Sequence, residues 1–225
     1  MSLLDGRYAP ISDAIGFLEA DFTQVVAADA RWRASLGGYR GRSVNGALPR
    51  LLDALLPLTG PLVRYVWVET TGPWTAYFDN FVLGSDAFGP VSYLAQQLGC
   101  RGVEIGCREG TARRGAAASF SLYGPVPTEW LNVVRSVAAV QDDGRWEWSA
   151  TGTAQPFEDL SAYQRRRVLD RLTADMLAGY CAALGIRPFD EAFYATAGQL
   201  VENVQITGNV RTETLQQARV WHGLE

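Results

Sequence analysis

Apolar positions recur with helical spacing in three long segments of the chain. They return every three to four residues over 12–36, 47–57 and 159–184, and a glycine or a proline stands at the end of each segment. Thr214 and Gln217 form the capping-box pattern that opens a helix, so a last short helix is expected there. The pattern therefore predicts helices in both the first and the last part of the chain.

The middle of the chain changes to the alternation and composition of strands. Segments 62–69 and 74–79 are rich in β-branched and aromatic residues, and a Thr-Gly-Pro turn separates them. A second pair, 135–141 and 145–151, flanks Asp142-Asp143-Gly144, in which glycine supplies the positive φ of a tight turn. Two β-hairpins are therefore predicted. Further strands are expected over 100–107 and 116–123, and a short helix over 90–98. Segment 199–206 fits either a helix or a strand, with a strand preferred.

These elements predict a single α+β domain over residues 1–225, with an N-terminal helical part (1–60) followed by hairpin–helix units (61–225). We expect an antiparallel sheet of about five to seven strands, with helices packed on one face and the N-terminal helices against an edge. Each unit has a tryptophan near the start of its second strand and a Leu-Gly-x-Arg exit from its helix. This suggests an internal repeat with pseudo-twofold symmetry and a cleft between the two hairpins.

Composition removes several kinds of catalytic chemistry. All 20 basic side chains are arginine, so no Schiff-base lysine or phosphate-loop lysine can exist. One histidine, His222, and three scattered cysteines do not provide the ligand spacing of a zinc site. We therefore predict no metal and no cofactor. An all-carboxylate site at Asp79 and Asp86 is the remaining possibility, but these two residues also suit the end of a strand and the cap of a turn.

The nucleophile and phosphate motifs are also missing. The chain has no Gly-x-Ser-x-Gly sequence, and its glycine-rich segment 99–106 follows a helix instead of opening one. Cys100, Cys107 and Cys181 each sit in an apolar periodic element, which favours small buried side chains over reactive thiols.

A carboxylate pair is the catalytic arrangement that the composition leaves open. Glu69, Asp79 and Glu104 lie on predicted strands, and two facing acids can serve as general acid and base, with Arg101 steering an anionic substrate. In this alternative, the protein is an enzyme or a small-molecule binder whose site lies in the cleft between the hairpin units.

The hairpin aromatics support a different hypothesis. Trp67, Trp74, Tyr77 and Trp148 lie on predicted strands, where large rings either fill a core or form an exposed surface for a protein partner. With Arg101 they make up the candidate binding residues. Both interpretations remain open, because alternation alone does not say which face of the sheet is covered.

Net charge and the lengths of the apolar segments suggest the kind of partner and the cellular compartment. The net charge is −4 and no basic run occurs, which disfavours nucleic acid and membrane surfaces as partners. No stretch approaches the ~20 apolar residues of a membrane helix, and no apolar leader is evident, so a cytoplasmic protein with reduced thiols is expected. The lysine-free composition is typical of high-GC bacterial genomes. We therefore expect a non-enzymatic protein-binding module of the kind that neutralises a basic partner, such as an immunity-type protein paired with a toxin.

Overall fold

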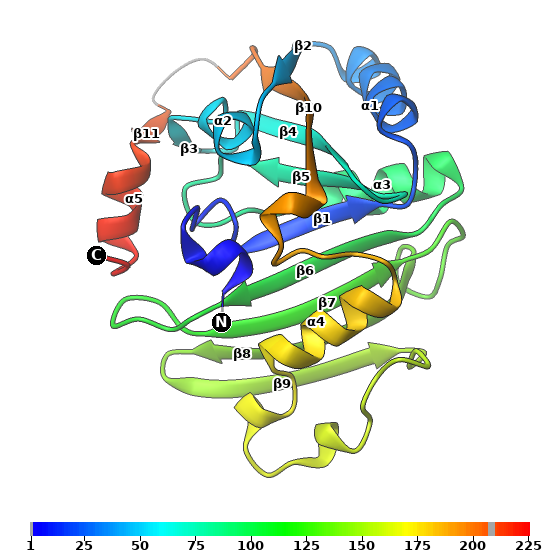
Figure 1. Ribbon diagram of the computed structural model, residues 1–225, viewed down its shortest axis with the longest axis vertical. Coiled ribbons are helices and arrows are strands. Elements are labelled where there is room, and N and C mark those ends of the chain that lie inside the picture. The colour runs from blue at the N-terminus through cyan, green and yellow to red at the C-terminus, as the bar shows by residue number, and fades with distance from the viewer. Residues whose placement is uncertain (1, 207–209) are drawn as a thin grey trace.

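The computed structural model describes residues 2–206 and 210–225, and a nine-stranded antiparallel sheet runs through it (Figure 1). In sheet order, its strands are β2 (Tyr39–Asn45), β10 (Tyr194–Asn203), β4 (Arg64–Thr70), β5 (Thr75–Asp79), β1 (Ala14–Leu18), β6 (Gly102–Arg108), β7 (Ala117–Tyr123), β8 (Val133–Asp142) and β9 (Arg145–Gly152). Two further strands, β3 (Leu58–Gly60) and β11 (Arg211–Glu213), pair with each other. The fold is α+β as expected, but the sheet is larger than the five to seven strands predicted.

Helices pack on both faces of the sheet. The α-helices are α1 (Phe22–Leu36), α2 (Leu48–Asp53), α3 (Phe88–Leu98), α4 (Ala174–Ala183) and α5 (Leu215–Trp221), and the 3-10 turns are η1 (Leu3–Gly6), η2 (Ala162–Gln164), η3 (Val168–Asp170) and η4 (Glu191–Phe193). On β4, Tyr65 and Trp67 face α1 and α3, whereas Val66 and Val68 face α2, α4 and the N-terminal segment (Figure 1). The expectation of helices on one face is therefore wrong, because the central strands are apolar on both sides.

The first predicted helix begins later than expected. Residues 14–18 form β1, which lies between β5 and β6 in the middle of the sheet. Gly16 allows α3 to pack closely on β1. Any side chain at this position would clash, because its Cβ would lie 2.6 Å from the side chains of Ala87, the N-cap of α3, and Val91. The true helix start is Asp21, whose carboxylate accepts a hydrogen bond from the backbone N–H of Thr23. A five-residue apolar run fits the periodicity of a helix and that of a strand, and here pairing with β5 and β6 makes it a strand.

The predicted helix over 159–184 is mostly wrong. Only its last part is helical, as α4. Thr173 is the N-cap of α4, and its hydroxyl oxygen accepts a hydrogen bond from the backbone N–H of Met176. The residues before it form η2 and η3, separated by extended backbone at Arg165 and Arg167. Tertiary contacts override helix propensity here, because Glu158, just before the segment, pairs with Arg135 of β8, and the Tyr163 hydroxyl bonds to Glu158 and Tyr180.

The predicted hairpins and the capping box at Thr214 are confirmed. β8 and β9 pair from Asp142 opposite Arg145, and Asp143 and Gly144 between them have φ of 45° and 77°, as a two-residue turn requires. β4 and β5 form the first hairpin. The capping box of α5 is present, and the helix over 90–98 is α3.

The structure does not show the suggested repeat. Three strands (β1, β6 and β7) lie between the two hairpins in the same sheet, so the hairpins do not enclose a cleft. The longer second unit, from Trp146 to Leu184, would need a longer helix than the first, but α3 covers 11 residues and α4 covers 10.

Candidate functional site

Asp79 is enclosed at the end of β5. Its side chain is 0% exposed, and its oxygens accept hydrogen bonds from the backbone N–H groups of Phe81 (3.0 Å) and Asp86 (2.9 Å) and from the Ser85 hydroxyl (3.1 Å). Burial raises the pKa of Asp79 to about 7, against the lowering effect of these three donors. The carboxylate therefore holds the 80–86 loop on the end of the strand, and this loop encloses it.

Glu104 and Glu69 do not join Asp79 in one site. Glu104 and Tyr77 both pair with Gly16, so Glu104 lies about 10 Å, or two strands, from β5. Its carboxylate accepts a hydrogen bond from the Tyr123 hydroxyl (2.9 Å), and burial raises its pKa. Glu69 pairs with Thr75 at the opposite end of β5 and lines a cavity that includes neither of the other two acids.

The raised pKa of Asp79 predicts a pH dependence of stability. Because the folded-state pKa (about 7) is above the ordinary value of 3.8, the folded state binds the proton more tightly between these values. We expect this group to make the protein less stable as pH rises from about 4 to about 7, at up to about 1.4 kcal/mol per pH unit. Urea unfolding of wild type and Asp79→Asn across this range measures it. The same slope in both proteins would contradict the assignment.

Three of the four aromatic candidates are core residues. Trp67, Trp74 and Tyr77 are 0%, 2% and 1% exposed, so they do not present the aromatic surface that was one of the two interpretations. Trp148 is half-buried, with its ring 4.8 Å from that of Tyr163. The continuous apolar run over residues 65–68 was a signal of burial on both faces, which the expectation of helices on one face overlooked.

Arg101 is held in an ion pair. Its guanidinium donates to both carboxylate oxygens of Glu19, at 2.5 Å and 2.6 Å, and lies 5.8 Å from the centre of the Trp74 ring. The bidentate pair holds Arg101 just before the first residue of β6, away from Asp79 and Glu104. Arg101 therefore does not steer an anionic substrate towards these acids.

The cysteines and the histidine are buried. Cys107 and Cys181 lie in the core and Cys100 is half-buried, and burial raises the pKa of Cys100 and Cys107 to about 11, which disfavours the thiolate. His222 is 4% exposed, and its Nε2 lies 2.9 Å from the Val82 carbonyl oxygen. No pattern in the sequence indicated that this histidine is fixed in the fold, because its partner, Val82, is distant along the chain.

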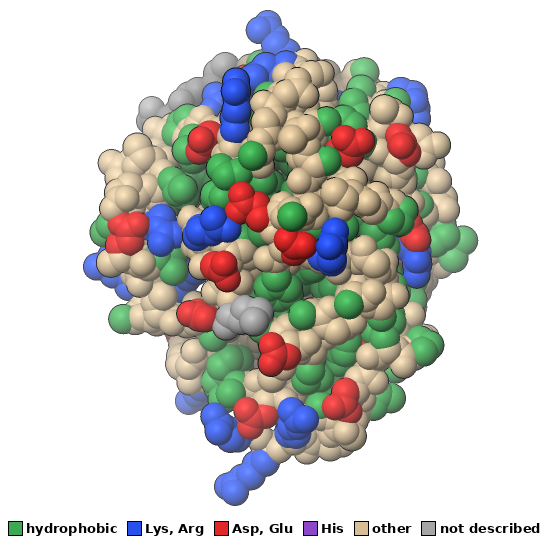
Figure 2. Space-filling model, viewed as in Figure 1, with side chains coloured by type: hydrophobic (Ala, Val, Ile, Leu, Met, Phe, Trp, Pro, Cys, Tyr) green, Lys and Arg blue, Asp and Glu red, His purple; other side chains and the backbone are tan. Residues whose placement is uncertain are grey.

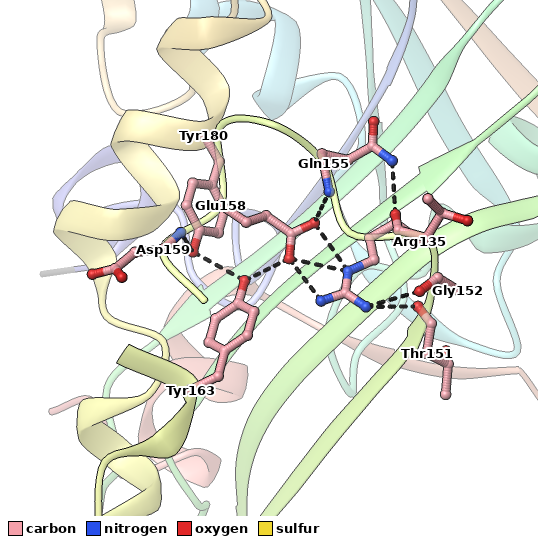
Figure 3. Close-up of polar contacts among 9 residues, drawn as sticks. Arg135, Thr151, Gly152, Gln155, Glu158, Asp159, Tyr163 and Tyr180 are labelled. Atoms are coloured by element: carbon pink, nitrogen blue, oxygen red, sulfur yellow. Dashed lines mark hydrogen bonds and ion pairs between the residues drawn. The ribbon is translucent and has the colours of Figure 1, made fainter. Parts of the chain in front are cut away.

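A buried ion pair joins β8 to the segment that precedes α4 (Figure 3). Arg135 and Glu158 side chains are 6% and 0% exposed, and the Arg135 guanidinium donates to both Glu158 oxygens at 2.7–3.0 Å. Glu158 also accepts from the backbone N–H of Gln155 (2.7 Å) and the Tyr163 hydroxyl (2.8 Å). Every group is paired within the protein, so the cluster is structural, and it explains why residues 159–173 do not form a helix.

The loop between β7 and β8, residues 124–132, carries several exposed apolar side chains, and we call it the Trp130 loop. Its Val126, Trp130 and Leu131 side chains are 64%, 60% and 51% exposed. The Trp130 ring stacks on Phe88 with centres 5.7 Å apart, and a cavity of about 490 Å³ lies between Trp130 and the end of β9. Apolar groups gathered in this way on a surface usually mark a binding site.

The Trp130 loop is held rigidly at its base. Asn132 is 0% exposed; its amide nitrogen donates to the carbonyls of Ser92 and Gly124, and its amide oxygen accepts from the Ser92 hydroxyl. Leu131 has a φ of 53°, a conformation that costs energy for a residue with a Cβ. The exposed side chains are therefore displayed by a loop of defined conformation, which lowers the entropy lost on binding.

Sequence reasoning missed this loop because it considered only aromatics on strands. Two signals were present: Pro125 and Pro127 exclude a regular strand or helix, and a surface loop has little means of burying Trp130 and Leu131. An apolar pair in a proline-bounded loop is therefore a candidate for an exposed binding surface.

Charge is distributed evenly on the face that carries α4. Figure 2 shows acidic and basic side chains interspersed there, without a block of one sign. Over residues 2–206 and 210–225, no group of three or more His, Cys, Asp or Glu side chains is arranged to hold a metal ion. None of the described helices has the length and apolar character needed to cross a membrane.

Comparison with known proteins adds no relative. The chain matches no family model, no curated protein and no solved structure.

Proposed function

We propose that this chain is a protein-binding module that recognises its partner through the Trp130 loop. The observation that carries the proposal is the display of three exposed apolar side chains, Val126, Trp130 and Leu131, on a loop fixed by buried Asn132. Tryptophan is enriched among the residues that dominate interface energies, and a preorganised loop loses little entropy on binding.

The charge of the loop favours a basic partner. The Trp130 loop has no cation, and the exposed Glu129 carboxylate has no hydrogen bond or ion pair with the described residues. A partner with an apolar pocket and a basic rim would complement both features. The most specific form of the proposal is an immunity-type protein that neutralises a basic toxin, to which the net charge of −4 also points.

Capture of the partner tests this function. Wild type and Trp130→Ala are used as baits against the native host's proteins and against the product of the neighbouring gene. We expect wild type to retain a basic protein stoichiometrically, and Trp130→Ala to lose it. Trp221→Ala is the matched control, because Trp221 is 45% exposed on α5, outside the loop, and this variant should capture the partner as wild type does.

Salt and charge variants test the basic character of the partner. Glu129→Gln should slow association at low ionic strength, and the difference from wild type should shrink as added salt screens the charge. A protein that captures no partner but turns over a metabolite would contradict the proposal and favour the enzyme alternative.

A further inference from the structure

β2 is an outer edge of the nine-stranded sheet (Figure 1). The Gly46 N–H donates to the Thr196 carbonyl oxygen at 2.9 Å, and this bond fixes the ladder so that the even-numbered residues of β2 bond to β10. The N–H and C=O groups of the odd-numbered residues, including Tyr39, Gly41 and Ser43, therefore point away from the sheet. No hydrogen bond among the described residues uses them. A row of such groups is a template for another strand.

Two arginines of β2 flank Gly41 on the face of the sheet that α2 covers. Arg40 and Arg42 are exposed and have no hydrogen bond or ion pair with the described residues. Glu202 lies directly opposite Arg40 on β10, but its carboxylate is paired with Arg64 at 2.7 Å. Both guanidinium groups are therefore available to a strand laid along the edge.

These charges select an acidic strand over a second copy of β2. Antiparallel self-pairing centred on Gly41 puts Arg40 opposite Arg42 of the other copy, and pairing centred on Arg42 puts that residue opposite itself. Like charges directly opposite each other destabilise a strand pair, whereas opposite charges stabilise it. A carboxylate on each side of the residue that pairs with Gly41 would meet both arginines.

A polar group lies beside Gly41 on the opposite face of the strand. Gly41 lines a cavity of about 140 Å³ between α1 and the sheet. The Gln199 amide reaches over Gly41: its Nε2 would lie 2.7 Å from a Cβ there, and its Oε1 accepts a hydrogen bond from the Ser43 hydroxyl at 3.3 Å. Nε2 donates to no acceptor among the described residues. An acceptor such as a glutamine side chain therefore suits the position opposite Gly41.

We propose that β2 binds an extended acidic segment of another protein as an added antiparallel strand. Backbone hydrogen bonds to Tyr39, Gly41 and Ser43 supply affinity, and carboxylates that meet Arg40 and Arg42 supply specificity. β2 lies at one end of the strand order, and the Trp130 loop joins β7 to β8 towards the other end. This site is therefore independent of the proposed function.

A blocked peptide, acetyl-Val-Thr-Glu-Gln-Glu-Thr-Val-amide, tests the site by calorimetric titration at low ionic strength. Its sequence reads the same in both directions, with two glutamates around a central glutamine. We expect one peptide to bind per chain with saturation. Replacing both glutamates by glutamine should weaken binding about tenfold, and added salt should reduce that difference. No saturable binding of the parent peptide would overturn the proposal.

Two further ligands separate strand addition from attraction between charges. A peptide with N-methylglutamine at its centre keeps both carboxylates but cannot donate to the Gly41 carbonyl, so it should bind about tenfold more weakly. Binding of this derivative as tight as that of the parent peptide would contradict strand addition. A short oligo-deoxythymidine that displaces the peptide and binds more tightly would assign the arginines to a nucleic acid, and would also overturn the proposal.

Variants of the protein place the peptide on β2. Arg40→Gln combined with Arg42→Gln should weaken binding about tenfold, whereas Arg145→Gln, which changes an exposed arginine on the opposite edge strand β9, should bind as wild type does. Ser43→Pro removes an outward N–H and leaves the backbone bonds to β10 in place, so it should prevent binding while the protein stays folded. Equal binding by wild type and the double arginine variant would overturn the assignment to β2. Trp130→Ala should bind the peptide normally, which keeps this result separate from the protein-binding proposal.

Discussion

Replacing Glu158 by alanine is expected to lower the free energy of unfolding by about 3–5 kcal/mol, because it leaves Arg135 buried without its counter-charge. In the wild-type protein, the Arg135 guanidinium donates hydrogen bonds to both carboxylate oxygens of Glu158 (Figure 3). In the variant it keeps only its hydrogen bonds to the carbonyl oxygens of Thr151 and Gly152, at 3.3 Å and 3.1 Å. Urea unfolding at neutral pH measures the loss.

Two controls separate burial from charge. Arg167→Ala breaks an ion pair with Asp170 in which the side chains are 67% and 37% exposed, and it should cost less than about 1 kcal/mol. The double variant Arg135→Met with Glu158→Leu removes both charges and should recover most of the stability. If Glu158→Ala and Arg167→Ala cost the same small amount, the Arg135–Glu158 pair does not hold the 153–173 segment in place.

Replacing Trp67 by alanine is expected to cost about 3–5 kcal/mol, since it removes a fully buried ring. The Trp67 ring lies 5.0 Å from the ring of Tyr77 and 6.4 Å from that of Tyr65, so its loss leaves a cavity beneath α1 and α3. Trp67→Phe should cost less, because it keeps most of the volume and removes an N–H that has no hydrogen-bond partner. Chemical denaturation of the three proteins gives these values.

Trp130→Ala is the matched comparison, because the same ring is removed from the surface. Trp130 is 60% exposed, so its loss should change the free energy of unfolding by less than about 1 kcal/mol. Similar losses at Trp67 and Trp130 would mean that the distinction between core and surface tryptophans is wrong.

Local signals predicted the elements whose structure is decided locally. The turn at Asp143 and Gly144 needs positive φ, and the capping box at Thr214 bonds within one helical turn, so both could be predicted from neighbouring residues. The candidate carboxylates were placed on strands correctly, but their mutual distance depends on strand order. β1 separates β5 from β6, and nothing local indicates that insertion.

The remaining errors come from contacts between segments far apart in the chain. Residues 159–173 have a helical apolar pattern, yet Glu158 is bonded to Arg135 and Tyr163 to Tyr180, and these bonds fix the segment in another conformation. Trp67 stands in a continuous apolar run, residues 65–68, which is typical of a strand buried on both faces, but the run does not say that α1 and α3 cover the Trp67 side. Which segments cover a face is a property of the assembled layers, which the pattern along one strand does not contain.

The affinity of the captured partner for wild type and Trp130→Ala, measured alongside the free energy of unfolding of each, tests the protein-binding function most directly. If the Trp130 loop is the recognition surface, Trp130→Ala should lose about 2 kcal/mol or more of binding free energy, about a 30-fold loss of affinity, with nearly unchanged stability. Trp221→Ala should bind as wild type does. Equal affinities of all three proteins for the partner would contradict the proposal.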